Sequence, residues 1–305
     1  MTQTVTPQHD PIPIGDVARP PFARLPDPST MFARRAERLR SLAKASALKS
    51  YLIFLADIGD VQHRLQDGLP QETRVAADAI VRARQFGMPP LERSGFKRDA
   101  AFDEAWGRLL AWSDEIVMPD NARLALARVR GTDADGQTEL IRGVLSNPVP
   151  GGALAEQLFA AAVLEVHFAR SAAQLDVKSL RPVGQGACPV CGAPPVSSLV
   201  VGWRDAQATR FCACSLCGTL WNYPRIKCTL CGATEDIGYQ QIVGGSATVK
   251  AETCQSCRRY VKVLHQRDDA GLDSVADDVA TLALDILLRD TDFQRGAVNP
   301  FLIGY

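Results

Sequence analysis

The sequence lacks the features that mark exported, membrane-spanning or strongly nucleic-acid-binding proteins. Its first ten residues show neither the basic cluster nor the apolar core of a secretory signal. No run approaches the roughly 18 apolar residues of a membrane span. The 34 Lys and Arg residues balance 34 Asp and Glu residues, so the chain as a whole has no general attraction for polyanions or anionic membranes. We therefore expect a soluble protein in the reducing cytoplasm, without membrane insertion.

Catalytic motifs are also missing. The chain contains no glycine-rich phosphate loop followed by lysine, no Gly-x-Ser-x-Gly and no His-Glu-x-x-His. Its four histidines are scattered, and none lies at a two-ligand spacing from another: they are His9, His63, His167 and His265. Surface or core positions explain these histidines better than catalysis does. We expect no catalytic residues and a protein that is not an enzyme.

What the sequence does contain is a dense block of cysteines. All nine lie between residues 188 and 257, and intervals of 22, 10 and 22 residues separate four Cys-x-x-Cys pairs. A shift of 40 residues therefore superimposes the first two pairs on the last two. This pattern indicates an internal duplication of one metal-ribbon unit. The paired cysteines are Cys188/Cys191, Cys214/Cys217, Cys228/Cys231 and Cys254/Cys257.

The chemistry of a four-thiolate metal site requires this spacing. Two thiolates three positions apart on a tight turn can face one ion, and a second such turn completes a tetrahedron. Glycine follows three of the pairs, as Gly192, Gly218 and Gly232, and permits the positive φ that turns amide groups toward sulfur. Disulfides are disfavoured because the chain shows no export signal, and a thioredoxin-like redox motif is disfavoured because one active pair would not be duplicated.

The duplication predicts that each repeat closes its own site. The eight paired cysteines are thus the predicted ligands of two metal ions, and either zinc or iron suits a four-cysteine tetrahedron. The alternative is a cross-braced arrangement in which the first pair joins the third. Cys212 is the odd cysteine, and a small buried apolar role is favoured over a substitute ligand or a reactive thiol.

Periodicity divides the chain into an α+β fold. Helical spacing predicts helices near residues 31–43, 48–65, 71–86, 102–113, 121–130, 136–146 and 153–174. Strand-like runs follow at 196–203, 209–212, 220–223, 239–243, 248–251 and 260–264. Ser29 and Ser274 are the predicted N-caps of the first and last helices, and the last helix should bury Val275, Val279, Leu282, Ile286 and Leu287.

These elements predict five consecutive regions. A proline-rich, extended arm precedes an all-α domain, two tandem four-cysteine β modules of rubredoxin-like or zinc-ribbon-like type, and a C-terminal helix whose tail packs on the body. The predicted boundaries are 1–28, 29–178, 179–226, 227–268 and 269–305.

The cysteine region also contains basic and aromatic residues, a combination typical of nucleic-acid-binding surfaces. Residues 176–270 carry 11 Lys and Arg against 7 Asp and Glu, but two divalent ions with eight thiolates would cancel that surplus. We therefore expect no nucleic acid as a partner. The arginines between Arg34 and Arg40 are interpreted as a solvated helix face, with a partner-binding face as the alternative.

The chain resembles the FdhE family of formate dehydrogenase accessory proteins. The resemblance lies in the Leu25-Pro-Asp-Pro segment with Phe32-Ala-Arg-Arg-Ala-Glu-Arg-Leu, in the Cys188-Pro-Val-Cys-Gly and Lys227-Cys-Thr-Leu-Cys motifs, and in the Asn299-Pro-Phe-Leu ending. It covers nearly the whole chain. It implies a cytoplasmic, non-catalytic maturation factor that binds the catalytic subunit of an exported respiratory formate dehydrogenase. It also implies rubredoxin-like metal sites, which favours iron over zinc.

The resulting hypothesis is an assembly factor, or chaperone, whose two metal sites are structural or redox-sensing. Two alternatives stay open: an electron-transfer protein of rubredoxin type, and a nucleic-acid-binding zinc ribbon. The sequence also leaves a homo-oligomer open.

Overall fold

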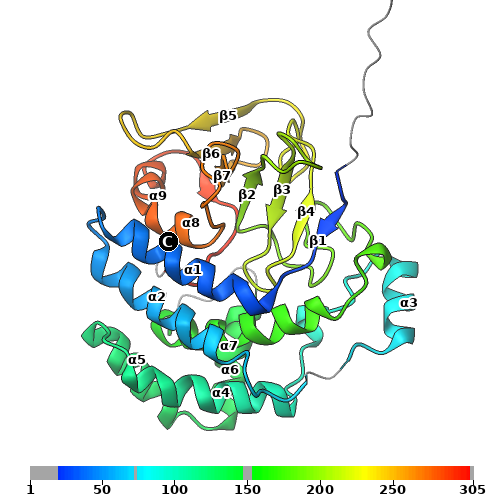
Figure 1. Ribbon diagram of the computed structural model, residues 1–305. Helices are drawn as coiled ribbons and strands as arrows, with labels where there is room; N and C mark the ends of the chain where they lie inside the picture. Colours follow the sequence, from blue (N-terminus) through cyan, green and yellow to red (C-terminus); the bar gives the residue numbers. More distant parts are fainter. Residues whose placement is uncertain (1–19, 72–73, 147–152, 303–305) are drawn as a thin grey trace, which may run out of the picture.

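The computed structural model describes residues 20–71, 74–146 and 153–302. Over these residues a layer of helices lies against a mixed sheet, and the last helices pack beside the sheet (Figure 1). This is the α+β architecture that the sequence predicts. Most of the predicted N-terminal arm (residues 1–19) and the last three residues of the predicted tail lie outside the described residues.

The helical layer is built from the segments with apolar residues at helical spacing. Helix α7 runs through this layer and contacts α1, α2, α4, α5 and α6, which explains why it is buried on nearly every side. Short 3-10 turns occur at Arg93–Gly95, Ser113–Glu115 and Val177–Ser179. The helices are α1 (Pro28–Ala43), α2 (Lys49–Arg64), α3 (Ala77–Phe86), α4 (Ala100–Trp112), α5 (Asp120–Gly131), α6 (Ala134–Leu145) and α7 (Leu154–Ala173).

The N-cap of the first helix lies two residues before the predicted one. Asp27 is the N-cap, and its carboxylate accepts hydrogen bonds from the Ser29 amide and hydroxyl at 3.1 and 2.5 Å. Pro28 occupies the first turn, where its missing N–H costs no hydrogen bond. The prediction of Ser29 as cap was wrong because aspartate is an equally good N-cap and the following proline fits the first helical position.

The cysteine region forms one sheet in which both repeats share the same strand pattern. Within each repeat three strands pair antiparallel in sequence order, and the 40-residue shift places β2 on β5, β3 on β6 and β4 on β7. The strands are β2 (Ser197–Val200), β3 (Arg210–Ala213), β4 (Leu220–Asn222), β5 (Ile237–Gln240), β6 (Val249–Cys254) and β7 (Arg259–Leu264).

The two repeats are joined edge to edge rather than standing as separate small sheets. Strand β2 of the first repeat pairs parallel with β7 of the second, so the sheet runs β1-β4-β3-β2-β7-β6-β5. Two-residue strands at the chain ends complete it: β1 (Ala23–Arg24) pairs with β4, and β8 (Gln294–Arg295) pairs with β7. The chain ends thereby tie both repeats to the rest of the molecule.

The last helix is broken, which the sequence did not predict. It forms α8 (Ala276–Ala280) and α9 (Leu282–Arg289), separated at Thr281. The break changes the helical phase, so Leu284 and Leu288 are buried whereas Ile286 and Leu287 are exposed. Ser274 is also not the cap: Asp273 accepts hydrogen bonds from the amides of Val275 and Ala276.

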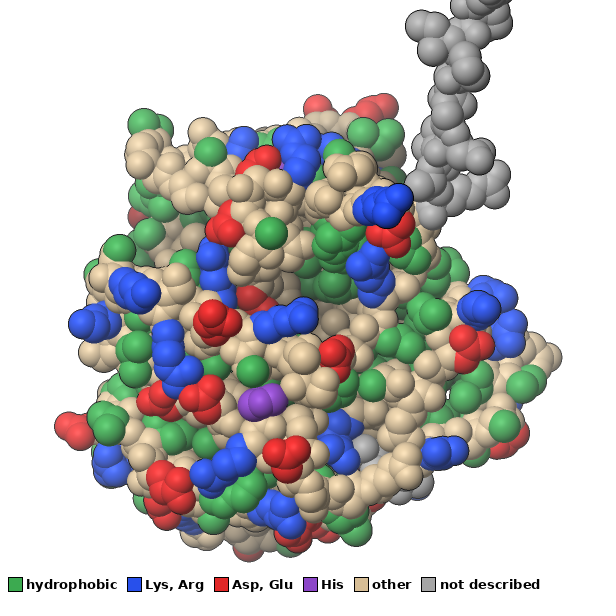
Figure 2. Space-filling model, in the orientation of Figure 1, with side chains coloured by type: hydrophobic (Ala, Val, Ile, Leu, Met, Phe, Trp, Pro, Cys, Tyr) green, Lys and Arg blue, Asp and Glu red, His purple; other side chains and the backbone are tan. Residues whose placement is uncertain are grey.

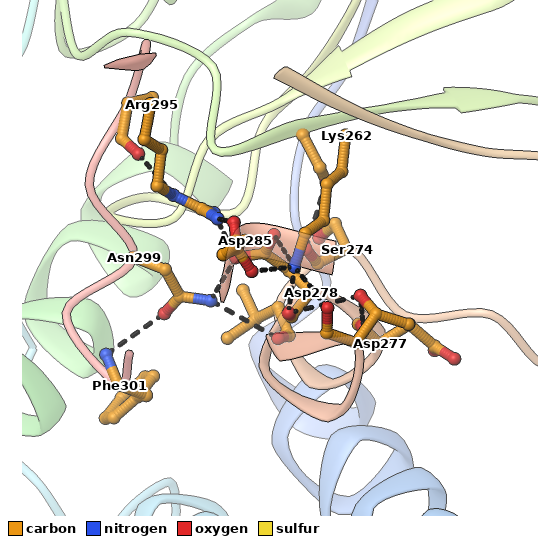
Figure 3. Close-up of polar contacts among 12 residues, drawn as sticks. Lys262, Ser274, Asp277, Asp278, Asp285, Arg295, Asn299 and Phe301 are labelled. Carbon is orange, nitrogen blue, oxygen red and sulfur yellow. Dashed lines mark hydrogen bonds and ion pairs between the residues drawn. The ribbon is translucent and has the colours of Figure 1, made fainter. Parts of the chain in front are cut away.

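A buried lysine explains the break. Lys262, fully buried in β7, places its ammonium 2.7 and 3.2 Å from the carbonyl oxygens of Asp278 and Thr281 and 2.5 Å from the Asp285 carboxylate (Figure 3). In a continuous helix these carbonyl groups would accept hydrogen bonds from backbone amides of the next turn, whereas here they accept hydrogen bonds from the lysine. Arg295 and Asn299 bind the Asp278 carboxylate from the C-terminal segment, so the network closes around α8 (Figure 3).

Among the described residues, none of the helices combines the length and the apolar character that a membrane crossing requires.

Candidate metal centres

The eight paired cysteines gather into two groups of four, one in each repeat. The first group is Cys188, Cys191, Cys214 and Cys217, and the second is Cys228, Cys231, Cys254 and Cys257; within each group all sulfur atoms lie within 4.8 Å of one another. The sulfurs therefore group within each repeat, as the duplication predicts, and the cross-braced alternative is wrong. All nine cysteines are free thiols in this structure.

The sulfur spacing suits a tetrahedral ion. In the first group the Sγ atoms of Cys188 and Cys217 lie 3.6 Å apart, and those of Cys191 and Cys214 lie 3.4 Å apart. The corresponding distances in the second group are 3.9 and 3.7 Å. A regular tetrahedron with metal–sulfur bonds of about 2.3 Å separates its sulfurs by about 3.8 Å. These distances fit one zinc or iron ion in each group, with no coordination position left for a substrate.

Each cysteine turn depends on one residue with positive φ directly after the second cysteine. Gly192, Gly218 and Gly232 have φ of 75°, 70° and 81°, and Arg258 takes the fourth position at 53°. In every turn the amide of this residue donates to the carbonyl oxygen of the first cysteine, at 2.9–3.1 Å. The glycine pattern in the sequence thus reports a real backbone requirement, which Arg258 meets at a steric cost.

Burial makes the first group unfavourable for bare thiolates. Desolvation raises the pKa of the Cys188 and Cys191 thiols well above the ordinary value. At Cys214 burial acts in the same direction, but hydrogen bonds from the other three cysteines outweigh it and lower the pKa. A buried divalent cation would offset the desolvation penalty of all four thiolates together, because its positive charge lowers the pKa of the thiols that coordinate it.

The two groups differ in their access to solvent. All four cysteines of the first group are buried, whereas Cys231 of the second is exposed and Cys257 is half-buried. The first group lies beside helix α1, where Met31 packs against Gly218, and beside the loop at Pro89, which packs against Gly192. The second group belongs to the repeat at the far edge of the sheet, where β5 is an outer strand.

Cys212 lies in neither group. It is fully buried in β3 opposite Trp221, and burial raises the pKa of its thiol to about 12. This placement agrees with a small apolar residue rather than a ligand. Neither group contains a histidine; His167 instead packs against the rings of Phe96 and Phe102.

Three of the four arginines of helix α1 form ion pairs with other helices. Arg35 is 4% exposed and binds Glu165 of α7 at 2.9 Å, so the interpretation as a wholly solvated face was wrong at this position. Arg38 binds Asp277 of α8, and Arg40 binds Asp57 of α2. Arg35, Arg38 and Arg40 therefore link helix α1 to the neighbouring helices, whereas Arg34 is exposed.

A groove of about 810 Å³ separates helix α1 from the sheet. Its floor includes Leu199, Trp203 and Leu220, and Arg34 and Arg38 lie along the helix side. The space-filling view is hollowed there, with hydrophobic side chains between basic ones (Figure 2). The groove thus lies between the helical layer and the first repeat.

Sequence reasoning missed the buried ion pair that links the repeats. Arg210 of β3 is 2% exposed and binds Glu252 of β6 at 2.8 Å, and it also donates to Ser198 of β2. Tyr239 of β5 donates to the other Glu252 oxygen at 3.0 Å. The available signal was a charged residue at the start or centre of an otherwise apolar strand, which applies to Lys262 as well.

Comparisons with known proteins give one consistent family. Three FdhE domain models match in series: the N-terminal model over residues 20–185, the central domain over 187–225 and the C-terminal domain over 226–302. A "Protein FdhE homolog" of Rhizobium meliloti is 41% identical over 98% of both chains. One of Proteus mirabilis is 33% identical over 92% of this chain and 91% of its own. The crystal structure of the FdhE protein from Pseudomonas aeruginosa superimposes with a TM-score of 0.82 at 29% identity, covering 93% of this chain and 99% of that one.

Proposed function

Because the chain belongs to the FdhE family, we propose that it is a cytoplasmic accessory protein required for the maturation of formate dehydrogenase. In this role it binds the catalytic subunit of a respiratory formate dehydrogenase and performs no turnover of its own. The observation that carries the proposal is the pair of saturated four-cysteine groups within a chain that spans 98% of a curated FdhE relative.

The two groups would each hold one metal ion through the eight paired cysteines named above. Four thiolates fill a tetrahedral shell, so the ions would stabilise the fold, and iron would also permit electron transfer, but neither would offer a site for substrate. The resemblance to the family favours iron; the sulfur geometry accepts zinc equally. This saturated coordination supports a protein that assists an enzyme rather than one that acts as an enzyme.

The difference in burial supports separate roles for the two groups. The buried first group holds its two turns under helix α1 and is suited to a structural ion. The second group, with Cys231 exposed, is suited to respond to oxidants or to iron supply. An accessory protein with such a group would adjust its action on the client to the redox state of the cytoplasm.

An electron-transfer protein of rubredoxin type is the second candidate function. The exposure of Cys231 favours it, because electron transfer needs a redox centre near the surface. A reversible one-electron couple in the isolated protein would support this candidate. Zinc in protein isolated without added metal would exclude it, since zinc has no redox chemistry.

Co-purification from the native cytoplasm tests the proposed function. The full-length tagged chain is isolated without added metal, its partners are identified by mass spectrometry, and its metal content is measured in the same sample. We expect a molybdenum- or tungsten-type oxidoreductase subunit, recovered also with the control variant Cys212→Ala. If no such subunit is recovered while the protein carries two ions, the assembly role is contradicted although the metal sites stand.

A further inference from the structure

A second, smaller cavity lies on the sheet where the two repeats meet. It has a volume of about 160 Å³ and is lined by residues of the five strands β2, β3, β5, β6 and β7 and of two adjoining loops. Val200 of β2 and Val263 of β7 form its apolar base, and the Arg210–Glu252 ion pair borders it. It lies apart from both cysteine groups, none of whose members lines it.

The charges around this cavity do not cancel. Arg210 and Glu252 neutralise each other at 2.8 Å. This leaves Arg225, from the linker between the repeats, and Lys250 of β6 as further lining cations. Within the described ranges, no carboxylate lies within ion-pair distance of either one; the Arg225 guanidinium has only a long contact of 3.5 Å with the Ala208 carbonyl. Two positive charges at one small cavity therefore have no protein counter-charge.

A histidine nitrogen at the same cavity also lacks a partner. The Nε2 atom of His265 is buried and makes no hydrogen bond in the described part of the chain. A buried polar atom without a partner costs free energy, and an anion bound beside the two cations would remove this cost by accepting a hydrogen bond from the nitrogen. From the charges and this nitrogen together, we propose that the cavity binds a small oxyanion, of carboxylate or phosphate type, between Arg225, Lys250 and His265.

The shape and composition of the cavity determine the class of ligand. An oxyanion accepts several hydrogen bonds, which suits the guanidinium, the ammonium and the imidazole as donors. The apolar base and the volume of about 160 Å³ favour a compact anion over a nucleotide or a polyanion. The site is independent of the proposed maturation role and depends only on the sheet that joins the repeats.

Calorimetric titration of the full-length, metal-loaded protein tests the site. Inorganic phosphate and formate, the smallest carboxylate, are titrated separately at constant low ionic strength, so that the two arms distinguish a tetrahedral anion from a planar one. We expect saturable binding of one anion per chain in at least one arm. Lys250→Gln and Arg225→Gln should each weaken it about tenfold, because each removes a charge-assisted hydrogen bond.

Arg204→Gln is the matched control. It removes the same charge from an exposed position of the same sheet region that does not line the cavity, and it should leave the affinity unchanged. The NMR signals of the His265 ring should shift on titration and be absent in His265→Ala. No saturable binding in either arm, or an equal loss of affinity in Arg204→Gln, would overturn the proposal.

Discussion

The residue after each Cys-x-x-Cys pair shows how a single backbone angle governs the cysteine turns. Three of the four positions are glycine, and the fourth is Arg258 with φ of 53°. A side chain in this left-handed region costs about 1–2 kcal/mol, which glycine avoids at an entropic cost of about 0.5–1 kcal/mol. The second repeat therefore has an unfavourable arginine at a turn position where the first repeat has the favourable glycine.

Arg258→Gly should stabilise the second repeat. The expected gain in the free energy of unfolding is up to about 1 kcal/mol, from relief of the backbone strain. The denaturation midpoint of the metal-loaded protein measures it. Arg259→Gly, one residue later in strand β7, serves as control and should destabilise by about 0.5–1 kcal/mol. A lower midpoint for Arg258→Gly would show that the angle is not strained.

Single residues also mark the limit of prediction from sequence. The eight grouped cysteines and the three glycine turns were predictable because their chemistry is local: short spacing fixes which thiols can meet. The pairing partners of Lys262 and Arg210 were not, because Asp285 and Glu252 lie 23 and 42 positions away. No periodic pattern records such a contact.

At the scale of elements, the strands were predicted more accurately than their assembly. Each predicted strand overlaps an observed one, since the cysteine turns bound them closely. The parallel pairing of β2 with β7 and the break at Thr281 depend on contacts between distant segments. The predicted apolar face of the last helix is confirmed at Val275 and Val279 but wrong at Ile286 and Leu287, because a continuous helix was assumed and Leu284 and Leu288 are buried instead.

Lys262→Met should destabilise the contact between the sheet and helices α8 and α9. It removes a fully buried ammonium and leaves Asp285 with Arg295 as its remaining cation, a change that costs about 3–5 kcal/mol when a buried pair is broken. Chemical denaturation of the purified variant measures the loss. Lys250→Met, on the adjacent strand and without an ion pair within the described residues, should change stability by less than about 0.5 kcal/mol. Equal effects would contradict the role assigned to the network.

At the scale of the whole molecule, the two repeats carry similar four-cysteine groups in different surroundings. The first repeat is covered by helix α1 and the helical layer, and the second lies at the outer edge of the sheet (Figure 1). Sequence could not predict this asymmetry, because both repeats carry the same cysteine spacing. The packing of the helices distinguishes them: the helical layer covers the first repeat, whereas the second contacts helices α8 and α9.

Metal release should therefore be biphasic. With excess chelator, we expect one ion per chain to leave at least about tenfold faster than the other, since release from the buried group requires local opening. Cys231→Ser should abolish or further accelerate the fast phase and leave the slow phase intact, whereas Cys212→Ala should preserve both. Absorbance of the chelator complex follows the kinetics. A single phase for both ions would contradict the proposed division of roles.

The most direct test of the central claim is metal analysis combined with X-ray absorption of the reduced, full-length protein, freshly isolated without added metal. The account predicts two ions per chain, each surrounded by four sulfur atoms at about 2.3 Å. Fewer than two ions per chain, or coordination shells dominated by nitrogen or oxygen, would contradict it.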